Sequence, residues 1–331
     1  MIRFILVALW VSSSIAMAQI PEKWFVAALA RSDGFAIAFG EAQNAKVRLQ
    51  RLKSDPLATK PLWLESSTAL ELAEARVVAT RLEVRRSLFQ NIFAWRNALD
   101  TFETASAKLN LADASAKATN ARFKVGAVTS VEVNRTEAEL RATQSEISSA
   151  RSELAATVEV LQNQLGFAPN AITPSQALPR PTRQVLERNL DSSVRIVDAK
   201  GALARAKLDF EIKDNEFSAP VEISEAKRNV SNAERNLADA RNGVKAALTT
   251  RWEVYQSAAG ALTARERAVQ LATDELKTQV ERLARGLVSQ LVILQARVAL
   301  VQAQSNLEFS HQRLATSVLE LAILVNLDLW R

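Results

Sequence analysis

The chain has 331 residues, a formal net charge of +6 and no cysteine. Without cysteine there are no disulfides and no thiolate chemistry, and a single tyrosine with eight glycines argues against an all-β protein. Basic and acidic residues alternate along the chain, as on solvated helix surfaces. No aromatic-basic motif accompanies them, so nucleic acid is not an expected partner.

The first 18 residues have the pattern of a secretory signal peptide. Arg3 precedes an apolar run over residues 4–11, and Ala16-Met17-Ala18 fits a small-x-small cleavage site. The run is shorter than the about 20 residues that a bilayer-spanning helix needs. We therefore expect an exported bacterial protein of the periplasm or cell envelope whose mature chain starts near Gln19. An uncleaved membrane anchor is the alternative.

Proline positions outline the helices that follow. The eight prolines fall within 21–61, within 169–181 and at 220, and proline breaks a helix interior. Strong helix formers fill the stretches between them. The predicted helices span 22–52, 66–125, 130–165, 184–212, 222–285 and 289–327. The second and fifth would be rods of about 90 Å, which are stable only when packed against other helices.

The predicted order along the chain is a signal peptide (1–18), a first helical repeat (19–165), a linker (166–183) and a second helical repeat (184–331). The linker, GFAPNAITPSQALPRPTR, holds four of the eight prolines. We expect it to separate the two repeats and to wrap against the outside of the helices.

The two halves repeat at an offset of 160 residues, which is the separation of Gly126 and Gly286. Apolar positions coincide at this offset: Val84, Leu88 and Leu161 fall on Val244, Leu248 and Leu321. A shared helical period could align apolar positions by chance. It would not also align the two glycines and the helix lengths, so the pattern indicates a duplication.

Apolar residues within the predicted helices recur at spacings of three and four. One such face is formed by Leu140, Ile147, Leu154, Val158 and Leu161. Small residues beside these faces allow helices to approach closely. The expected fold is therefore all-α, with long antiparallel helices in two tandem repeats forming a coiled-coil bundle. A generic filament-like coiled coil is the alternative.

The sequence has no enzyme signature. It contains no histidine–carboxylate cluster, no glycine-rich phosphate loop and no activated nucleophile. The single histidine, His311, lies within a helical pattern and is expected at a surface or an interface rather than as a metal ligand. We expect no enzymatic activity, no cofactor and no metal.

The repeated glycines lie in related segments, NARFKVGAVTSVEV at 120–133 and VERLARGLVSQLVI at 280–293. A helix commonly ends on a left-handed glycine, with cationic side chains in its last turn. Hydroxyl residues follow each glycine and can cap the next helix: Thr129 or Ser130 in the first copy and Ser289 in the second. Each segment therefore predicts a tight turn between antiparallel helices, at tips near 126–130 and 286–289.

The first segment resembles the motif R-[FY]-x-V-G-x-x-[ST]-x-x-[DE]-V of the TolC-like outer-membrane efflux proteins. The matching residues are Arg122, Phe123, Val125, Gly126, Thr129, Glu132 and Val133, and the second segment keeps Arg282, Gly286, Ser289 and Ile293. The resemblance covers nearly the whole mature chain, including the duplication, the long helices and the proline-rich linker.

In that family three protomers form a helical tunnel through the periplasm, so the resemblance implies a homotrimer and a TolC-like α-barrel protomer. It also implies docking of a periplasmic adaptor (membrane fusion) protein of an inner-membrane pump or secretion system at the turns. The implied docking residues are Arg122, Val125, Gly126, Val128, Thr129, Arg282, Gly286, Val288 and Ser289.

The sequence departs from the family between the first and second helices of each half, where members carry strand pairs of an outer-membrane β-barrel. A spanning strand needs about 9–11 residues, and neither 52–66 nor 212–224 has room for two. We expect these hairpins to be reduced to short loops, and outer-membrane association without spanning. Five apolar residues could form a short strand or pack a loop: Phe210, Ile212, Phe217, Val221 and Ile223.

A second departure from the family concerns the constriction that gates the tunnel. Family members often carry aspartates six and nine residues after the second glycine, where this chain has Val292 and Gln295. Glu132 keeps an acid at the first-copy equivalent. The resemblance implies that these three residues would line the pore, without strong cation selection.

Two functions follow from the sequence. The first is an efflux or export component whose tips dock an adaptor. The second is a structural or scaffolding coiled-coil protein of the cell envelope, which the short segments 52–66 and 212–224 favour.

Overall fold

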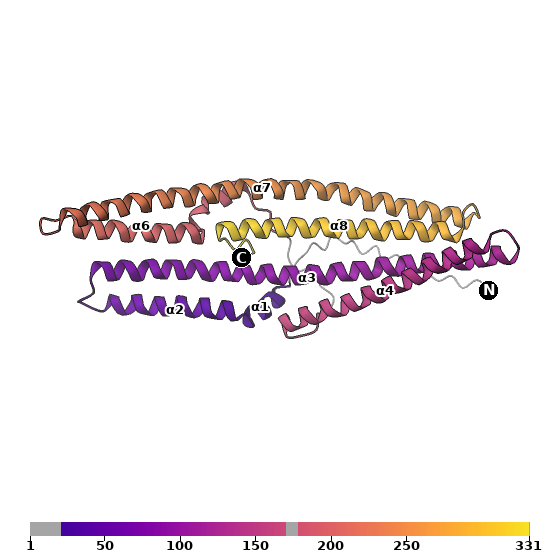
Figure 1. Cartoon of the computed structure of the whole chain (residues 1–331), viewed down its shortest axis with the longest axis horizontal. Coiled ribbons are helices and arrows are strands. Elements are labelled where there is room, and N and C mark those ends of the chain that lie inside the picture. Colours follow the sequence, from indigo (N-terminus) through magenta and orange to yellow (C-terminus); the bar gives the residue numbers. More distant parts are fainter. Residues whose placement is uncertain (1–20, 170–177, 331) are drawn as a thin grey trace.

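The computed structural model describes residues 21–169 and 178–330, and within these ranges the regular structure is entirely helical. The molecule is a long bundle with its helices aligned along one axis (Figure 1). Its elements are α1 (Glu22–Ala30), α2 (Asp33–Lys53), α3 (Lys60–Lys124), α4 (Ser130–Leu165), α5 (Arg183–Arg188), the 3-10 turn η1 (Leu190–Ser192), α6 (Val194–Lys213), α7 (Pro220–Ala284) and α8 (Gln290–Val325). The all-α prediction is confirmed.

The two tandem helical repeats have matching dimensions. Helices α3 and α7 each have 65 residues, and α4 and α8 each have 36. Each long helix pairs with two shorter ones placed end to end, α3 with α2 and α4, and α7 with α6 and α8 (Figure 1). The lengths of corresponding helices in the two halves are therefore equal, as a duplication at a 160-residue offset would require.

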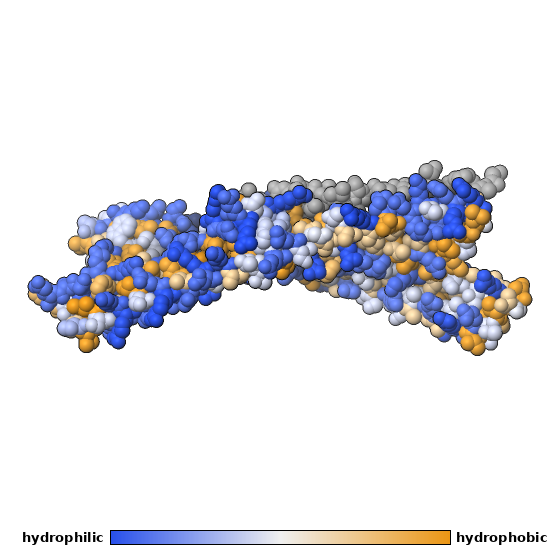
Figure 2. Space-filling view, turned by 90° about the horizontal axis from the view of Figure 1, so that it is seen from above, coloured by the Kyte–Doolittle hydropathy of each residue, from blue (hydrophilic) through white to orange (hydrophobic). Residues whose placement is uncertain are grey.

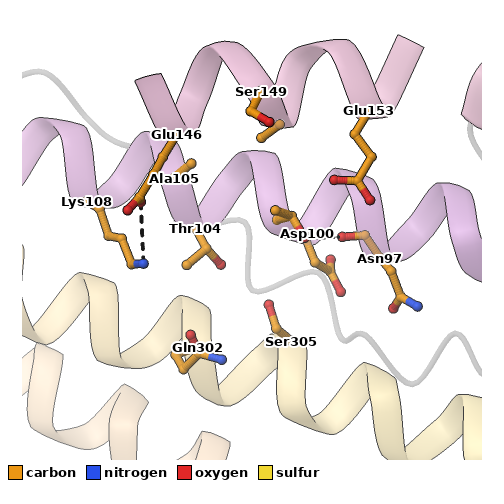
Figure 3. A pocket seen from close by; sticks show the side chains of 12 residues that line it. Asn97, Asp100, Thr104, Ala105, Lys108, Glu146, Ser149, Glu153, Gln302 and Ser305 are labelled. Carbon is orange, nitrogen blue, oxygen red and sulfur yellow. Dashed lines mark hydrogen bonds and ion pairs between the residues drawn. The ribbon is translucent and has the colours of Figure 1, made fainter. Parts of the chain in front are cut away.

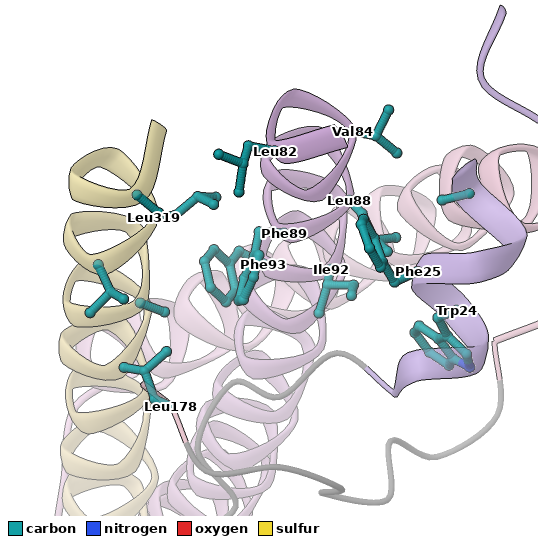
Figure 4. Packing of buried hydrophobic residues seen from close by; sticks show 14 of the residues in the cluster. Trp24, Phe25, Leu82, Val84, Leu88, Phe89, Ile92, Phe93, Leu178 and Leu319 are labelled. Carbon is teal, nitrogen blue, oxygen red and sulfur yellow. The ribbon is translucent and has the colours of Figure 1, made fainter. Parts of the chain in front are cut away.

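The core lies where α3 packs against α8, α1 and α4, near the middle of the bundle (Figure 4). Helix α3 supplies Leu82, Leu88, Phe89, Ile92 and Phe93, all buried. Each fully buried side chain of this size contributes about 1.5–3 kcal/mol relative to exposure. This junction holds the two repeats together.

Helix α4 is covered by fewer elements than its counterpart α8. Helix α4 packs against α3 and α1, whereas α8 packs against α7 and α3 and also contacts η1 and α5. As a result the predicted apolar face of α4 is only half-buried at Leu140, Ile147 and Leu154, and is fully buried only at Leu161. A single chain thus leaves apolar surface uncovered along α4.

Two predicted helices are divided by local caps. The stretch 22–52 breaks at residues 31–32, where Ser32 Oγ accepts a hydrogen bond of 3.2 Å from the Phe35 amide. The stretch 184–212 becomes α5, η1 and α6, and the Asn189 side chain donates to the Val185 carbonyl at 2.8 Å. The continuous-helix predictions were wrong here because these short polar side chains bond to the backbone and end the helices. The break frees α1 to bury Trp24 and Phe25.

The connections at the end remote from α4 are shorter than expected. Helix α3 begins at Lys60, with Pro61 in its first turn, and α7 begins at Pro220. Proline suits a first turn, because it lacks only an amide hydrogen that would be unbonded there. The segments 52–66 and 212–224 are therefore largely helical, joined by turns at 54–59 and 214–219. The suggestion that Phe217 joins a strand or packs a loop was wrong, since its side chain is 97% exposed.

A buried arginine joins α1 and the segment after α8 to α3. Arg85 lies 3.7 Å from Asp328 Oδ1, and its guanidinium carbon stacks 3.9 Å from the Phe25 ring centroid and 4.7 Å from that of Trp330. Arg81 Nε lies 3.1 Å from Asp328 Oδ2 without the alignment of a hydrogen bond. This cluster holds α1 and the segment after α8 against the middle of α3.

Two predictions concern, partly or wholly, residues outside the described ranges. The signal peptide at 1–18 lies outside the described residues, as do positions 170–177 of the 166–183 linker. At the end of that linker, Leu178 is buried in the core cluster beside α3 and α8 (Figure 4). None of the helices in the described ranges has a stretch apolar and long enough to cross a membrane.

Candidate functional site

The first tip turn joins α3 to α4 and is a Schellman turn centred on Gly126. This glycine has φ +72°, its amide donates to the Phe123 carbonyl at 2.9 Å, and the Ala127 amide donates to the Arg122 carbonyl at 2.9 Å. Thr129 then caps α4, its side chain accepting from the Glu132 amide at 3.4 Å. The residues of the first repeated segment thus end one helix and start the next.

The second tip turn repeats this geometry between α7 and α8. Gly286 has φ +71°, its amide donates to the Leu283 carbonyl at 2.9 Å, and the Leu287 amide donates to the Arg282 carbonyl at 2.9 Å. Ser289 occupies the position before α8, but its side chain makes no capping hydrogen bond. The second turn is therefore held by its backbone alone.

Both glycines are required by backbone conformation and not by space. A Cβ at Gly126 or Gly286 would meet no atom within 4 Å, but a left-handed φ is strained for any other L-residue. The two turns lie at the same end of the molecule (Figure 1). Viewed from above, that end divides into two separate arms (Figure 2).

The predicted docking residues are mostly on the surface of these arms. Val128 and Val288 are half-buried, and the exposed ones are Arg122, Val125, Gly126, Thr129, Arg282, Gly286 and Ser289. Val125 is 78% exposed. The sequence prediction missed Leu287, which is 65% exposed at the second tip and falls on Ala127 at the 160-residue offset. The sequence signal that could have indicated Leu287 is its place as an apolar residue directly after the turn glycine Gly286.

The predicted pore-lining residues lie just behind the tips. Glu132 is in the first turn of α4 and is exposed, while Val292 and Gln295 lie near the start of α8, half-buried and exposed respectively. They come from two different hairpins.

A polar cleft of about 500 Å³ lies further along the bundle, between α3, α4 and α8 (Figure 3). Asn97, Asp100 and Thr104 from α3 face Gln302 and Ser305 from α8. At one edge Lys108 Nζ lies 3.6 Å from Glu146 Oε2 on α4. The sequence did not indicate this cleft, because its walls come from helices nearly 200 residues apart.

Asp100 is the perturbed acid of this cleft. Burial raises its pKa to about 6, Glu308 and Glu103 add to the rise, and Arg96 opposes it. Arg96 is paired with Glu308 across the α3–α8 contact at 2.5 Å. One turn along α8, His311 is buried at an interface between helices, as the sequence allowed, and burial lowers its pKa. Burial raises the pKa of the acid Asp100 and lowers the pKa of the base His311, because it disfavours the charged form of each. Desolvation is therefore the main influence on the pKa values at this contact.

Replacing Asp100 by asparagine is expected to stabilise the protein at pH 8 but not at pH 4.5. The raised folded-state pKa means that the stabilising contribution of Asp100 is fully present below its ordinary pKa of 3.8 and is lost as the pH rises through about 6. Asparagine cannot lose a proton, so the variant should gain on the order of 1–2 kcal/mol over the wild type between these pH values. Urea denaturation at both pH values measures it.

Asp113, whose side chain is 45% exposed and pairs with Lys117 on the same helix, provides the control. Asp113→Asn should show no such gain. An equal stability difference for Asp100→Asn at the two pH values would show that burial does not raise this pKa.

Across the described ranges, histidine and carboxylate side chains nowhere gather in a group of three or more that could hold a metal ion. Of the titratable groups with a shifted pKa, Asp100 lines the cleft and His311 is buried on α8.

Part of the chain matches a known family model. Residues 66–167 match the family model "Outer membrane efflux protein", which covers most of α3 and all of α4. The matching family is one of efflux proteins and not of enzymes. No curated relative matches the chain.

Solved structures show the same fold over nearly the whole chain. The Vibrio cholerae outer membrane protein VceC has a TM-score of 0.63 at 14% identity, over 92% of this chain and 95% of that one. CusC, whose structures concern transmembrane channel formation, has a TM-score of 0.66 at 15% identity, over 92% and 95%. The Campylobacter jejuni CmeC outer membrane channel has a TM-score of 0.62 at 14% identity, over 92% and 85%.

The family match and these neighbours confirm the resemblance to TolC-like outer-membrane efflux proteins that the repeated turn motif indicated. The chain has the helical fold of these channels.

Proposed function

We propose that this protein is a periplasmic efflux or export component whose paired tips dock an adaptor protein of an inner-membrane pump or secretion system. The observation that carries the proposal is the repetition of one turn geometry, at Gly126 and Gly286, at the same end of two long helix pairs. Exposed apolar side chains beside both glycines, Val125 and Leu287, would supply contact area to the adaptor.

Three copies would form the conducting tunnel. Support comes from apolar side chains that one chain leaves exposed along its length, including Ile37 and Phe39 on α2 and Phe309 on α8. Phe309 also lines an open groove of about 460 Å³ together with Val254 and Phe93. Neighbouring copies would bury these faces, since burial of apolar area drives association.

The proposed arrangement keeps the division made from the sequence: a signal peptide at 1–18, repeats at 19–165 and 184–331, and the linker 166–183 between them. In this arrangement Glu132, Val292 and Gln295 would line the tunnel behind the tips, with too little charge for strong cation selection. The short connections 54–59 and 214–219 support a component that does not itself supply membrane-spanning strand hairpins.

The tips provide the test. Gly126→Val with Gly286→Val is expected to destroy both turns, because a β-branched residue is strongly disfavoured at φ near +70°. A strain carrying this double variant should accumulate a fluorescent efflux dye like a deletion strain. The wild-type chain should restore export.

Gly40→Val with Gly260→Val is the matched control. These glycines lie within α2 and α7 at negative φ, and an added Cβ would meet no atom within 4 Å. The control pair should therefore restore export. Full export by the tip variant, at wild-type protein levels, would contradict docking through these turns.

The alternative function is a structural scaffold of the cell envelope. The short connections at the end remote from the tips favour it, because they leave that end without room for strand pairs. On this alternative, deletion should alter envelope integrity without changing dye accumulation. The mass and electron-microscope shape of the purified mature protein separate the two: a hollow trimeric cylinder supports the tunnel, and a slender solid rod supports the scaffold.

A further inference from the structure

Two apolar side chains stand at the extreme end of the molecule opposite the tips. Leu57, in the turn between α2 and α3, is 85% exposed, and Phe217, in the turn between α6 and α7, is 97% exposed. Val221 and Ile212 beside the second turn are also exposed. We call these four residues the apolar end. The proposed tip docking and tunnel use none of them.

The same local device presents both side chains. Asp55 Oδ1 accepts a hydrogen bond of 2.9 Å from the Leu57 amide, and Asn215 Oδ1 accepts one of 2.8 Å from the Phe217 amide. The Asn215 side chain also donates to the Ile212 carbonyl at 2.7 Å. Each turn is thereby fixed with a large apolar residue at its apex, a position usually filled by small or polar residues.

The two turns are also fixed relative to each other. Helix α6 packs along α3, and Lys60 Nζ lies 2.6 Å from Glu211 Oε1 at the base of the two turns. Both turns point out of the same end of the bundle (Figure 1). Both apexes therefore lie at the same end of the long axis.

The two turns together are close to electrically neutral. Between Lys53 and Lys60 and between Lys213 and Ala219, three basic residues (Lys53, Lys60, Lys213) accompany three acidic ones (Asp55, Asp214, Glu216). Protruding apolar side chains can insert into a soft surface such as a lipid membrane. Because the charges of the turns balance, they give no preference for an anionic membrane. Phenylalanine and leucine are among the residues that insert at the headgroup boundary of a bilayer.

We propose that the apolar end inserts Leu57 and Phe217 into the interfacial layer of a zwitterionic phospholipid membrane. This inference rests on the proposed function and deepens it, because it names how the end remote from the adaptor meets the membrane. In a trimer six such turns would act together, and several weak insertions give stable attachment.

Flotation of the purified full-length mature chain with phosphatidylcholine vesicles tests the inference. The wild-type chain should float with the vesicles, equally at low and high salt, because the attachment is apolar. Leu57→Ser with Phe217→Ser should lower the partition coefficient at least about tenfold, since each side chain loses the free energy of leaving water. The circular dichroism of the variant should be unchanged, because both residues are exposed.

Phe123→Ser with Leu271→Ser is the matched control. It removes one phenylalanine and one leucine that are exposed on α3 and α7 away from the apolar end. The control should float like the wild type. Absence of flotation, equal loss in the control, or flotation that needs anionic lipid and disappears at high salt would each overturn the inference.

The outcome separates the two proposals. A trimer that exports dye but does not float would overturn membrane insertion and leave the tunnel intact. A chain that floats through Leu57 and Phe217 but is a solid monomeric rod would support insertion and contradict the tunnel.

Discussion

Replacing Arg85 by alanine is expected to lower the free energy of unfolding by about 3–5 kcal/mol, the usual cost of removing one partner of a buried ion pair. Arg85 is 2% exposed, and Asp328 is almost fully buried beside it. Burial lowers the pKa of Arg85, and Asp328 opposes that shift. The stacking of the guanidinium on Phe25 and Trp330 is lost as well, so the variant loses packing together with charge.

The neighbouring residue Arg86 provides the control for this variant. Its side chain is exposed and pairs with Glu83 on the same helix, an arrangement that contributes only about 0.3–0.5 kcal/mol. Urea denaturation followed by circular dichroism measures both variants. A loss below about 1 kcal/mol for Arg85→Ala would show that the cluster does not hold α1 and the segment after α8 to α3.

Replacing Leu88 or Leu248 by alanine is expected to cost about 2–5 kcal/mol in each case. The two leucines are equivalent at the 160-residue offset and both are fully buried. Leu88 lies in the cluster that joins α3 to α8, and Leu248 packs with Leu186, Leu321 and Val325. Each substitution leaves a cavity in a different part of the bundle, and the same denaturation measurement detects it.

Leu271→Ala is the control for both leucine variants, because this side chain on α7 is 70% exposed. It should change stability by no more than about 0.5 kcal/mol. If Leu88→Ala is costly and Leu248→Ala is not, the two repeats do not depend on equivalent core positions.

Much of the fold was predictable because its signals are local. The long helices and their turns were located by proline, by glycine and by the spacing of apolar residues, and the boundaries of α4 were predicted to the residue. The predictions failed where a short polar side chain ended a helix within an otherwise helical pattern, as Ser32 and Asn189 do. Periodicity over a long stretch does not reveal such a cap.

The candidate sites divide in the same way. The turns at Gly126 and Gly286 were predictable, because a left-handed glycine with its capping residues forms a contiguous motif. The cleft around Asp100 was not, since α8 supplies its far wall from residues such as Gln302. No spacing along one helix indicates which side chains of a distant helix will face it.

The sequence by itself determined the all-α class, the internal repeat, the two tip turns and the resemblance to TolC-like efflux proteins. Helix propensity, capping and apolar periodicity all act over a few residues, so they can be read from the chain. Only the tertiary structure decided that Arg85 is buried between Phe25 and Trp330 and that Leu57 and Phe217 protrude at one end. Burial depends on which segments meet in space. Nothing in the sequence around Arg85 indicates that this side chain is buried.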